Sequence, residues 1–388
     1  MEIVRLKSCD FEEAIDFLDF VFSKAYSPTH FRKMLPLCYQ PTDEHMSHNF
    51  AIRENGKIRA IVGLFPAQIQ VGDEILNLGG IGGVSAHPND RGKGWMKLLM
   101  NRSIEEMKST NTDLSFLIGL RQRYQYFGYE KAGILLEYKL QQTNIRHTFQ
   151  NSCPSNSDLH FVPLTASDLP YLKQIKKLHD RQPFYCIRPL SDFYLYLVAM
   201  NTKPWVALYP NGEVAGYLVT NQKQDRVTEI FAENDSVFSA MIYRWFAQRE
   251  IIESTVLLAP WQESYARFLS GIAEEYHLVD NGNWRIYNWE KVIGSLLTLK
   301  NAQHSLYEGS LSIGIKDYGT LYIRVANGTV ECRKTNLHPD IEWDPLTATR
   351  VLLGHFPAAF STEIPESLKA LIESWFPLPL CWLVQNDV

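Results

Sequence analysis

The residues from Gly82 to Lys97 constrain the fold more than any other stretch of this chain. An apolar run ends at Ala86, just before Pro88, and a short glycine-containing turn leads to an apolar-periodic segment that begins at Trp95. A strand, a glycine turn and a helix in this order are typical of an α/β fold. Because the free N–H groups and the dipole at the start of a helix attract anions, the segment also predicts a pyrophosphate site.

Two known phosphate-binding motifs do not match this turn. Gly92-Lys93 is followed by Gly94, where a Walker A loop needs Ser or Thr, and Gly80-x-Gly82 lacks the third glycine of the dinucleotide motif. A plain β-to-α connection that uses glycine only for its backbone angles also stays open. The turn alone therefore predicts either a pyrophosphate site or a simple connection.

Composition narrows the class of protein. The chain has 388 residues, enough for two or three domains, and its formal net charge of −5 argues against nonspecific binding of nucleic acid. The six cysteines have no paired spacing, which favours a reducing, cytoplasmic compartment and predicts neither disulfides nor a zinc site. His45 and His48 match no metal-ligand pattern, so we expect no metal. We also expect no signal peptide and no membrane span.

A second motif follows downstream of the turn. The predicted strand 114–118 leads into Tyr124-Gln-Tyr-Phe-Gly-Tyr129. In this order and at this spacing, Arg91-x-x-Gly94-x-Met96 and the tyrosine motif resemble the GNAT acetyltransferase superfamily. The resemblance implies that the turn holds the pyrophosphate of acetyl-coenzyme A. Met96 replaces a small residue of the family pattern, which matters little if only the backbone N–H is used.

The resemblance also implies a set of acetyl-CoA contacts. The end of the strand before the turn would form hydrogen bonds to the pantetheine arm and the acetyl carbonyl, while Arg91 or Lys93 would add positive charge at the pyrophosphate. The expected contacts are Val84, Ser85, Ala86, Arg91, Gly92, Lys93, Gly94, Trp95, Met96, Lys97, Gly119 and Leu120.

The family's general acid is the tyrosine three residues before Phe-Gly, which is Tyr124 here. A phenol is protonated at neutral pH and can donate its proton to a departing thiolate. Tyr126 stays open as an alternative donor, whereas Phe127 and Tyr129 are expected in the core.

The family can use its own C-terminal carboxylate as the base, which implies this role for Val388. The apolar, proline-containing ending favours docking onto another domain over packing within the tail. If the ending docks in this way, Asp387 is expected to attract a cationic amine. By analogy with the family, Phe22 and Tyr26 are expected to line the acceptor pocket.

Part of the pattern recurs later in the chain. The segment around Asn55-Gly56 returns around Asn211-Gly212, 156 residues later, and Val4-x-Leu6 returns as Val162-x-Leu164, 158 residues later. Two similar offsets predict a second domain of the same fold, with chance similarity of hairpins as the alternative. Because 229–245 contains no glycine, the second copy is expected to lack the cofactor turn.

The tail predicts a different fold. Alternation from Leu311 to Cys332 predicts a three-stranded meander, and helices are expected from Asp344-Pro345 and near Pro365. This α+β tail resembles a sterol-carrier-protein-like domain. The expected fold class is thus α/β (α+β): two tandem GNAT-like mixed-sheet domains, 1–150 and 158–285, followed by the tail domain 286–388. This order resembles the enhanced intracellular survival protein family of bacterial acetyltransferases.

The expected function follows from this resemblance. It is transfer of an acetyl group from acetyl-CoA to a primary amine, on a small molecule or a peptide, by direct attack in a ternary complex. The family further implies a homo-oligomer, often a hexamer. Two alternatives stay open: a longer acyl donor, and a non-catalytic carrier of lipid or small molecules with a degenerate GNAT domain.

Overall fold

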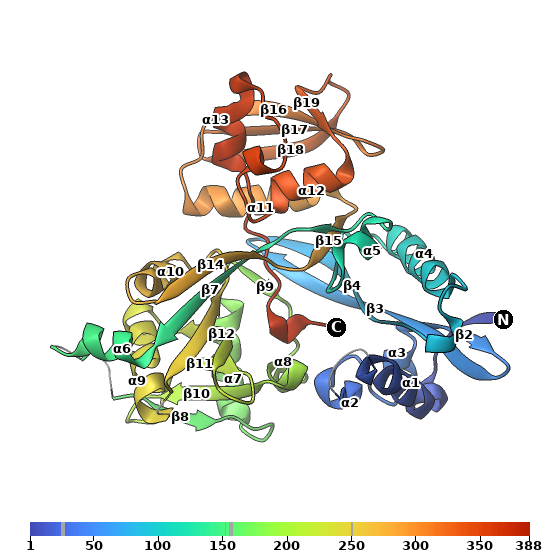
Figure 1. Ribbon diagram of the computed structural model, residues 1–388. Coiled ribbons are helices and arrows are strands. Elements are labelled where there is room, and N and C mark those ends of the chain that lie inside the picture. The colour runs from blue at the N-terminus through green and yellow to red at the C-terminus, as the bar shows by residue number, and fades with distance from the viewer. Residues whose placement is uncertain (25–27, 152, 155–157, 250) are drawn as a thin grey trace. The chain divides into compact units, whose positions relative to one another are not determined.

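The computed structural model describes residues 1–24, 28–151, 153–154, 158–249 and 251–388. The chain divides into two compact units (Figure 1). Unit 1 consists of Met1–Gly133, Asp280–Leu380 and Val388, and unit 2 consists of Ile134–Val279 and Cys381–Asp387. Each unit combines helices with a mixed sheet, so the predicted α/β class is confirmed.

The main sheet of unit 1 has the strand order β1-β2-β3-β4-β5-β15-β6. The strands β1 to β4 are antiparallel neighbours, whereas β4 and β5 run parallel and are joined through helix α4. The bounds are β1 (Glu2–Arg5), β2 (Asn49–Glu54), β3 (Lys57–Val71), β4 (Glu74–Ala86), β5 (Leu114–Leu117), β6 (Glu130–Lys131), β15 (Asn283–Ile286) and α4 (Trp95–Ser109).

Local sequence explains the β2–β3 hairpin. Asn55 and Gly56 have φ of 54° and 75°, as a two-residue turn of the I′ type requires. Helix α4 buries Leu99, Ile104 and Met107 in a core with these strands. Three further helices precede β2: α1 (Phe11–Ser23), α2 (Phe31–Met34) and α3 (Asp43–Met46). Another, α5 (Arg121–Gln125), follows β5.

The tail of unit 1 contains the predicted meander. Its sheet has the order β18-β17-β16-β19, and α12 begins at Pro345 because the Asp344 carboxylate accepts hydrogen bonds from the N–H groups of Leu346 and Thr347, at 3.0 and 3.1 Å. The bounds are α11 (Trp289–Gln303), β16 (Gly309–Ile315), β17 (Gly319–Ala326), β18 (Thr329–Thr335), β19 (Ile341–Trp343), α12 (Pro345–Leu353) and α13 (Glu366–Trp375).

The sheet of unit 2 repeats the topology of unit 1. Its order is β14-β7-β13-β12-β11-β10-β8, and β12 and β13 are again parallel and joined through a helix, α9 (Asp235–Arg249). The strands are β7 (Ile134–Gln141), β8 (His160–Pro163), β10 (Lys203–Leu208), β11 (Val214–Thr220), β12 (Arg226–Ala232), β13 (Glu253–Leu258) and β14 (Glu275–Asp280). The remaining elements are α6 (Gln142–Phe149), α7 (Leu169–Asp180), β9 (Phe184–Cys186), α8 (Phe193–Val198), α10 (Glu263–Ser270) and the 3₁₀ turn η5 (Val384–Asn386).

Strand pairing divides the chain differently from chain order. The segment 134–141 pairs with β13 in unit 2, and the segment 283–286 pairs with both β5 and β6 in unit 1. Boundaries at 150 and 285 would therefore separate each of these strands from its partners, whose backbone groups need the hydrogen bonds. The division into three domains stays a prediction.

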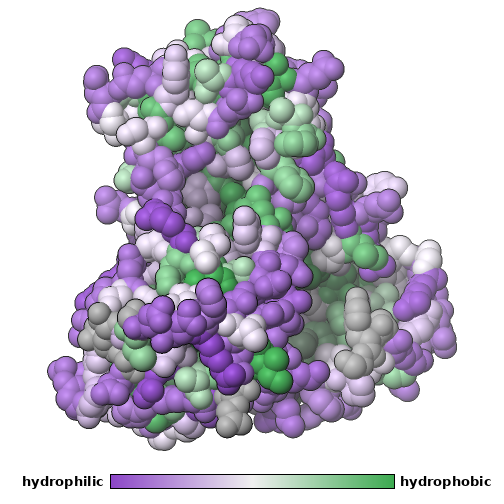
Figure 2. All heavy atoms as spheres, turned by 60° about the vertical axis from the view of Figure 1, so that its left-hand side comes forward, coloured by the Kyte–Doolittle hydropathy of each residue, from purple (hydrophilic) through white to green (hydrophobic). Residues whose placement is uncertain are grey.

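Hydrophilic side chains cover most of the face in Figure 2, with hydrophobic residues scattered among them. Within the part of the chain that the structure describes, none of the helices combines the length and hydropathy that crossing a bilayer requires.

Candidate functional site

Strands β4 and β5 separate at the centre of the unit 1 sheet. Their parallel pairing ends at Gly80 and Phe116, but β4 continues to Ala86. Beyond this point β4 carries a bulge, because Gly63 and Ile61 of β3 pair with Gly82 and Ser85. A bulge leaves backbone groups outside the ladder and changes their direction. Beyond this last pair, in the region that we call the notch between β4 and β5, the backbone groups of β4 therefore lie outside the β4–β5 ladder.

The carboxyl terminus of the chain lies against this part of β4. A Cβ atom added at Gly82 would collide with the carboxyl carbon of Val388, and one added at Gly80 would lie 2.7 Å from the Val388 Cγ2. Only glycine allows so close an approach. The structure thus brings the predicted base to the strand that carries the predicted acyl-CoA contacts Val84, Ser85 and Ala86.

Sequence reasoning missed Tyr39, whose hydroxyl reaches the same strand. Its side chain is 2% exposed, and among the described residues the hydroxyl has no hydrogen-bond partner. The hydroxyl lies so close to Gly83 that a Cβ there would collide with it. The Tyr39 ring packs edge-on against Phe65, with 5.7 Å between centroids. Burial, with a smaller effect of Cys38, raises the pKa of Tyr39, so its hydroxyl stays a donor.

Tyr124 lies in α5, just beyond the end of β5. Its ring packs directly over Gly119, where a Cβ would collide with it, and its side chain is 5% exposed. Phe127 and Tyr129 are buried as predicted, while Tyr126 is 91% exposed. Of the two candidate donors, Tyr124 is thus the enclosed one and Tyr126 the exposed one, and Gly119 is the residue that allows the position of the Tyr124 ring.

The turn before α4 has an open backbone. Gly92 and Gly94 have φ of 88° and 78°, in the left-handed region, and no atom lies within 4 Å of a Cβ built on either. Gly94 is the N-cap of α4 and offers no side chain to the first N–H groups of the helix. Alternating backbone conformations of this kind aim successive N–H groups at one point, which suits a phosphate. Arg91 is exposed beside them.

Lys93 is engaged within the protein. Its ammonium group lies 2.8 Å from Asp90 and 3.3 Å from Glu54, and it also lies over the Trp95 ring. The hydrogen bond with Lys93, together with Arg59, lowers the pKa of Asp90, and the pKa of Lys93 is raised in turn. Of the two cations expected at the turn, Arg91 is the one without an ion pair among the described residues.

The other residues predicted to contact acetyl-CoA differ in how far their side chains are exposed. Trp95 is buried in the core, so it offers a ligand only its backbone, whereas Lys97 and Leu120 are exposed and Met96 is half-buried. Phe22 packs edge-on against Phe31, which in turn contacts Tyr39.

Asp387 belongs to unit 2, and burial raises the pKa of its carboxyl group well above the ordinary value. A carboxyl group with a raised pKa is less readily ionised, so Asp387 is less suited to its expected role of attracting a cation. Tyr26 lies outside the described residues.

Comparisons with known proteins were made for the sequence and for the fold. Residues 2–132 match the family model described as an acetyltransferase (GNAT) domain. No curated protein matches in sequence. The end of the match at 132 coincides with the end of the first segment of unit 1.

Several solved structures share the fold over the whole chain. A GCN5-related N-acetyltransferase from Kribbella flavida has a TM-score of 0.69 at 14% identity, over 100% of this chain and 98% of that one. A protein of unknown function from Enterococcus faecalis, described as a probable N-acyltransferase, has 0.71 at 15%, over 98% of both chains. Eis1 from Mycobacterium abscessus has 0.68 at 14%, over 100% of both. Residues 2–132 therefore match a GNAT acetyltransferase domain in sequence, and the chain as a whole has the fold of these three structures.

Proposed function

We propose that the protein is an N-acetyltransferase that transfers the acetyl group of acetyl-CoA to a primary amine. The observation that carries this proposal is the position of the Val388 carboxyl group against Gly82, at the notch between β4 and β5. A chain terminus held on a bulged strand places a proton acceptor beside backbone donors. Acyl transfer to an amine needs both.

In this proposal the turn before α4 holds the pyrophosphate of acetyl-CoA. The N–H groups of Gly92, Gly94, Trp95 and Met96 bind its oxygens, and Arg91 adds charge, whereas the Lys93 N–H donates to the Asp90 carbonyl at 3.2 Å. The pantetheine arm follows β4 from Ala86 toward the notch. The bulge between Gly82 and Ser85 then supplies N–H groups that polarise the thioester carbonyl.

The proton transfers follow from the two groups at the notch. The Val388 carboxylate accepts the proton of the acceptor amine, directly or through a water molecule. The amine nitrogen attacks the thioester carbon and forms a tetrahedral intermediate. When the carbon–sulfur bond breaks, the thiolate leaves and takes the Tyr124 hydroxyl proton. Tyr39, whose hydroxyl is a buried donor at Gly83, is proposed to line the acceptor side of the same notch.

The wider architecture stays part of the proposal. The order of domains in the enhanced intracellular survival protein family, with a sterol-carrier-protein-like tail, is supported by the repeated sheet topology and by the meander. A homo-oligomer is proposed on the family resemblance alone, and a cytoplasmic location on the unpaired spacing of the cysteines. The acceptor is proposed to be an amine on a small molecule or a peptide.

The test is a thiol-release assay with acetyl-CoA and a panel of amines that includes aminoglycosides, polyamines and peptides. Isothermal calorimetry measures acetyl-CoA binding in parallel. We expect binding of one acetyl-CoA per chain and release of coenzyme A with at least one amine. A pure, folded protein that binds no acetyl-CoA would overturn the proposal and favour the carrier alternative.

A further inference from the structure

The C-terminal peptide, residues 381–387, packs as part of unit 2, and only the last residue, Val388, belongs to unit 1. Residues 381–387 belong to this unit, and η5 lies against β12. The Gln385 amide donates a hydrogen bond of 2.7 Å to the Thr228 hydroxyl. The Arg188 Nε donates one of 2.9 Å to the Asn386 Oδ1. Both peptide side chains are buried, so these bonds are enclosed in protein.

The group that binds Asn386 is itself held rigidly. The two terminal nitrogens of Arg188 donate to the two carboxylate oxygens of Glu229, at 3.0 and 2.7 Å, and both side chains are 0% exposed. The Tyr217 hydroxyl donates to the same carboxylate at 2.7 Å. Although burial opposes ionisation, the charge of Arg188 keeps the pKa of Glu229 below its ordinary value. A bidentate pair of this kind fixes the plane of the guanidinium group, and with it the direction in which the Arg188 Nε–H donates.

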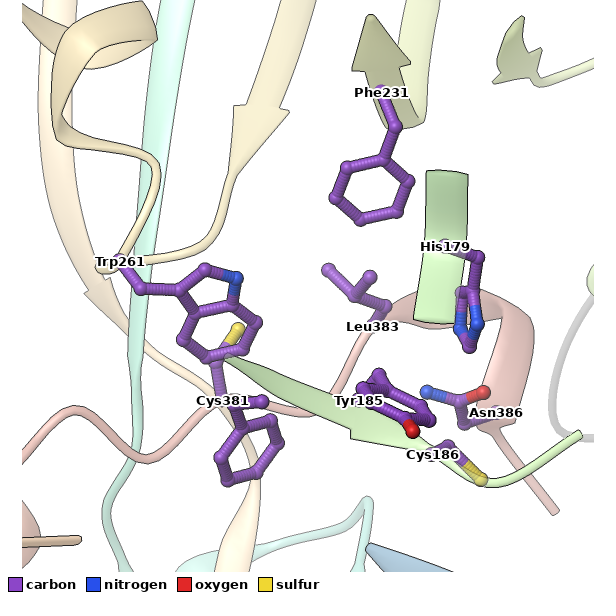
Figure 3. Close-up of a pocket in the computed structure, with 9 residues that line it drawn as sticks. His179, Tyr185, Cys186, Phe231, Trp261, Cys381, Leu383 and Asn386 are labelled. Atoms are coloured by element: carbon purple, nitrogen blue, oxygen red, sulfur yellow. The ribbon is translucent and has the colours of Figure 1, made fainter. Parts of the chain in front are cut away.

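Figure 3 shows the side chains that line a small pocket beside the peptide. Cys381, Leu383 and Asn386 face side chains of the sheet and its neighbours, among them Phe231 and Trp261, across a small pocket. Phe231 comes from β12 itself. The peptide therefore fills a groove of unit 2 with apolar as well as polar contacts.

This groove has the same place in its sheet as the notch in unit 1. The parallel pairing of β12 with β13 ends at Val227 and Val256, as that of β4 with β5 ends at Gly80 and Phe116. In β12, Glu229 lies two residues after Val227, the last residue paired with β13. In β4, Gly82 lies two residues after Gly80, the last residue paired with β5. The position that approaches the Val388 carboxyl group in unit 1 thus corresponds to the one that holds Arg188 in unit 2.

We propose that the second sheet has exchanged cofactor binding for peptide binding: its notch holds residues 381–387 of this chain. Arg188, Glu229 and Thr228 are then positioning residues for the Val388 carboxylate, two residues past Asn386. The second part rests on the proposed role of that carboxylate as base, whereas the first part does not.

The first test measures how firmly the peptide is held, without any activity. A carboxypeptidase is added to the folded full-length chain, and the release of Val388 is followed by mass spectrometry. Thr228→Val removes the hydroxyl that accepts from Gln385, and Thr228→Ser retains it. The hydroxyl also donates to the Val219 carbonyl at 3.2 Å, and serine retains that bond too. We expect release about tenfold faster for Thr228→Val and for Asn386→Ala, and a wild-type rate for Thr228→Ser.

The second test measures kcat and acetyl-CoA affinity in the same variants. We expect kcat to fall about tenfold in Thr228→Val and Asn386→Ala with the acetyl-CoA Kd unchanged, and Thr228→Ser to retain the wild-type kcat. Unchanged release of Val388 in both loosened variants would overturn the peptide-holding role. Faster release with an unchanged kcat would overturn the positioning role, provided that a chain extended past Val388 is inactive. If the extended chain is fully active, the base assignment fails instead, and the release rates still decide the first part.

Discussion

The two sheets of this protein share a topology but differ in the residues at the same strand positions. In unit 1, β4 carries Gly79, Gly80, Gly82 and Gly83, and a glycine turn separates it from α4. In unit 2, the chain from β12 through α9 contains no glycine, and Glu233 and Asn234 alone connect the strand to the helix. The same framework thus presents open backbone in one unit and large side chains in the other.

The difference shows what makes a sheet notch able to take a ligand. Glycine lets another backbone or a carboxylate approach within contact distance of the strand, and it makes left-handed angles available in the turn. In unit 2, the Thr228 hydroxyl accepts a hydrogen bond from Gln385 of the peptide, and Glu229 holds Arg188, which donates to Asn386. One fold therefore admits a carboxyl group against bare backbone in one sheet and a peptide against side chains in the other.

The largest effect is expected from moving the terminal carboxylate out of the first notch. Two glycines added after Val388 should lower kcat by about 10²–10⁴-fold, because a positioned base is lost. Two glycines added before Met1, which is 73% exposed, are the control and should leave kcat unchanged. An extended chain with full activity would show that the carboxylate is not the base.

The next effect compares a buried carboxylate in each unit. Glu229→Leu leaves the charge of Arg188 uncompensated and should cost about 3–5 kcal/mol of unfolding free energy. Glu130→Leu should cost less, because its partners Arg121 and Arg350 have side chains 46% and 30% exposed. Urea unfolding at pH 7 measures both.

Acid unfolding checks the same pair. Burial opposes ionisation of both glutamates, but their arginines outweigh it, so each folded pKa lies below its ordinary value. The stability that each contributes is therefore present above about pH 4.3, the ordinary glutamate pKa, and is lost as the pH falls below it. Each leucine variant should lose its part of this pH dependence. An equal cost for the two substitutions would contradict the difference in burial.

The tyrosine motif tests which phenol serves the first notch. Tyr124→Phe should lower kcat about 10²-fold and leave the acetyl-CoA Kd unchanged, since only the hydroxyl is removed from a buried ring. Tyr126→Phe is the matched control, because Tyr126 is 91% exposed. If the Tyr126 variant loses activity and the Tyr124 variant retains it, the assignment of the acid is reversed.

Substitution of Gly80 and Gly82 in β4 tests how closely Val388 must approach this strand. Gly80→Ala brings a Cβ to 2.7 Å from the Val388 Cγ2, and Gly82→Ala meets the carboxyl group of the same residue. Each should lower kcat about tenfold by displacing the carboxylate. Adding Val388→Gly to each variant distinguishes the two collisions. It removes the side chain that Gly80→Ala meets, so kcat should recover in that double variant. The carboxyl group that Gly82→Ala meets remains, so kcat should stay low in the other. Rescue of both variants by Val388→Gly would be inconsistent with this geometry.

The smallest effect is expected at the turn that unit 2 lacks. Arg91→Ala should weaken acetyl-CoA binding about three- to tenfold, and less at high salt, because an exposed charge next to a phosphate is screened. Lys93→Ala should weaken it less, since Lys93 is paired with Asp90 and Glu54. Calorimetry at two ionic strengths measures both. A stoichiometry of two acetyl-CoA per chain would contradict the contrast between the sheets.

Much of the local structure could be predicted because neighbouring residues decide it. Asn55-Gly56 fixed a hairpin through two positive φ angles, and Asp344-Pro345 fixed a helix start through a side-chain cap and a preset φ. The glycines at 92 and 94 marked the open turn for the same reason. The pairing of strands 134–141 and 283–286 left no such mark, since most of the strands that they pair with lie more than 100 residues away in the chain.

The candidate site shows the same division between features that adjacent residues decide and features that depend on tertiary packing. The sequence by itself determined the β-to-α turn, the tyrosine motif and the absence of glycine from β12 through α9, because each is a property of adjacent residues. Only the tertiary structure decided that Tyr39 meets Gly83, that Lys93 pairs with Glu54, and that Arg188 holds Asn386, 198 residues away in the chain. Such contacts depend on how many distant segments pack together, and no single stretch of sequence encodes that packing.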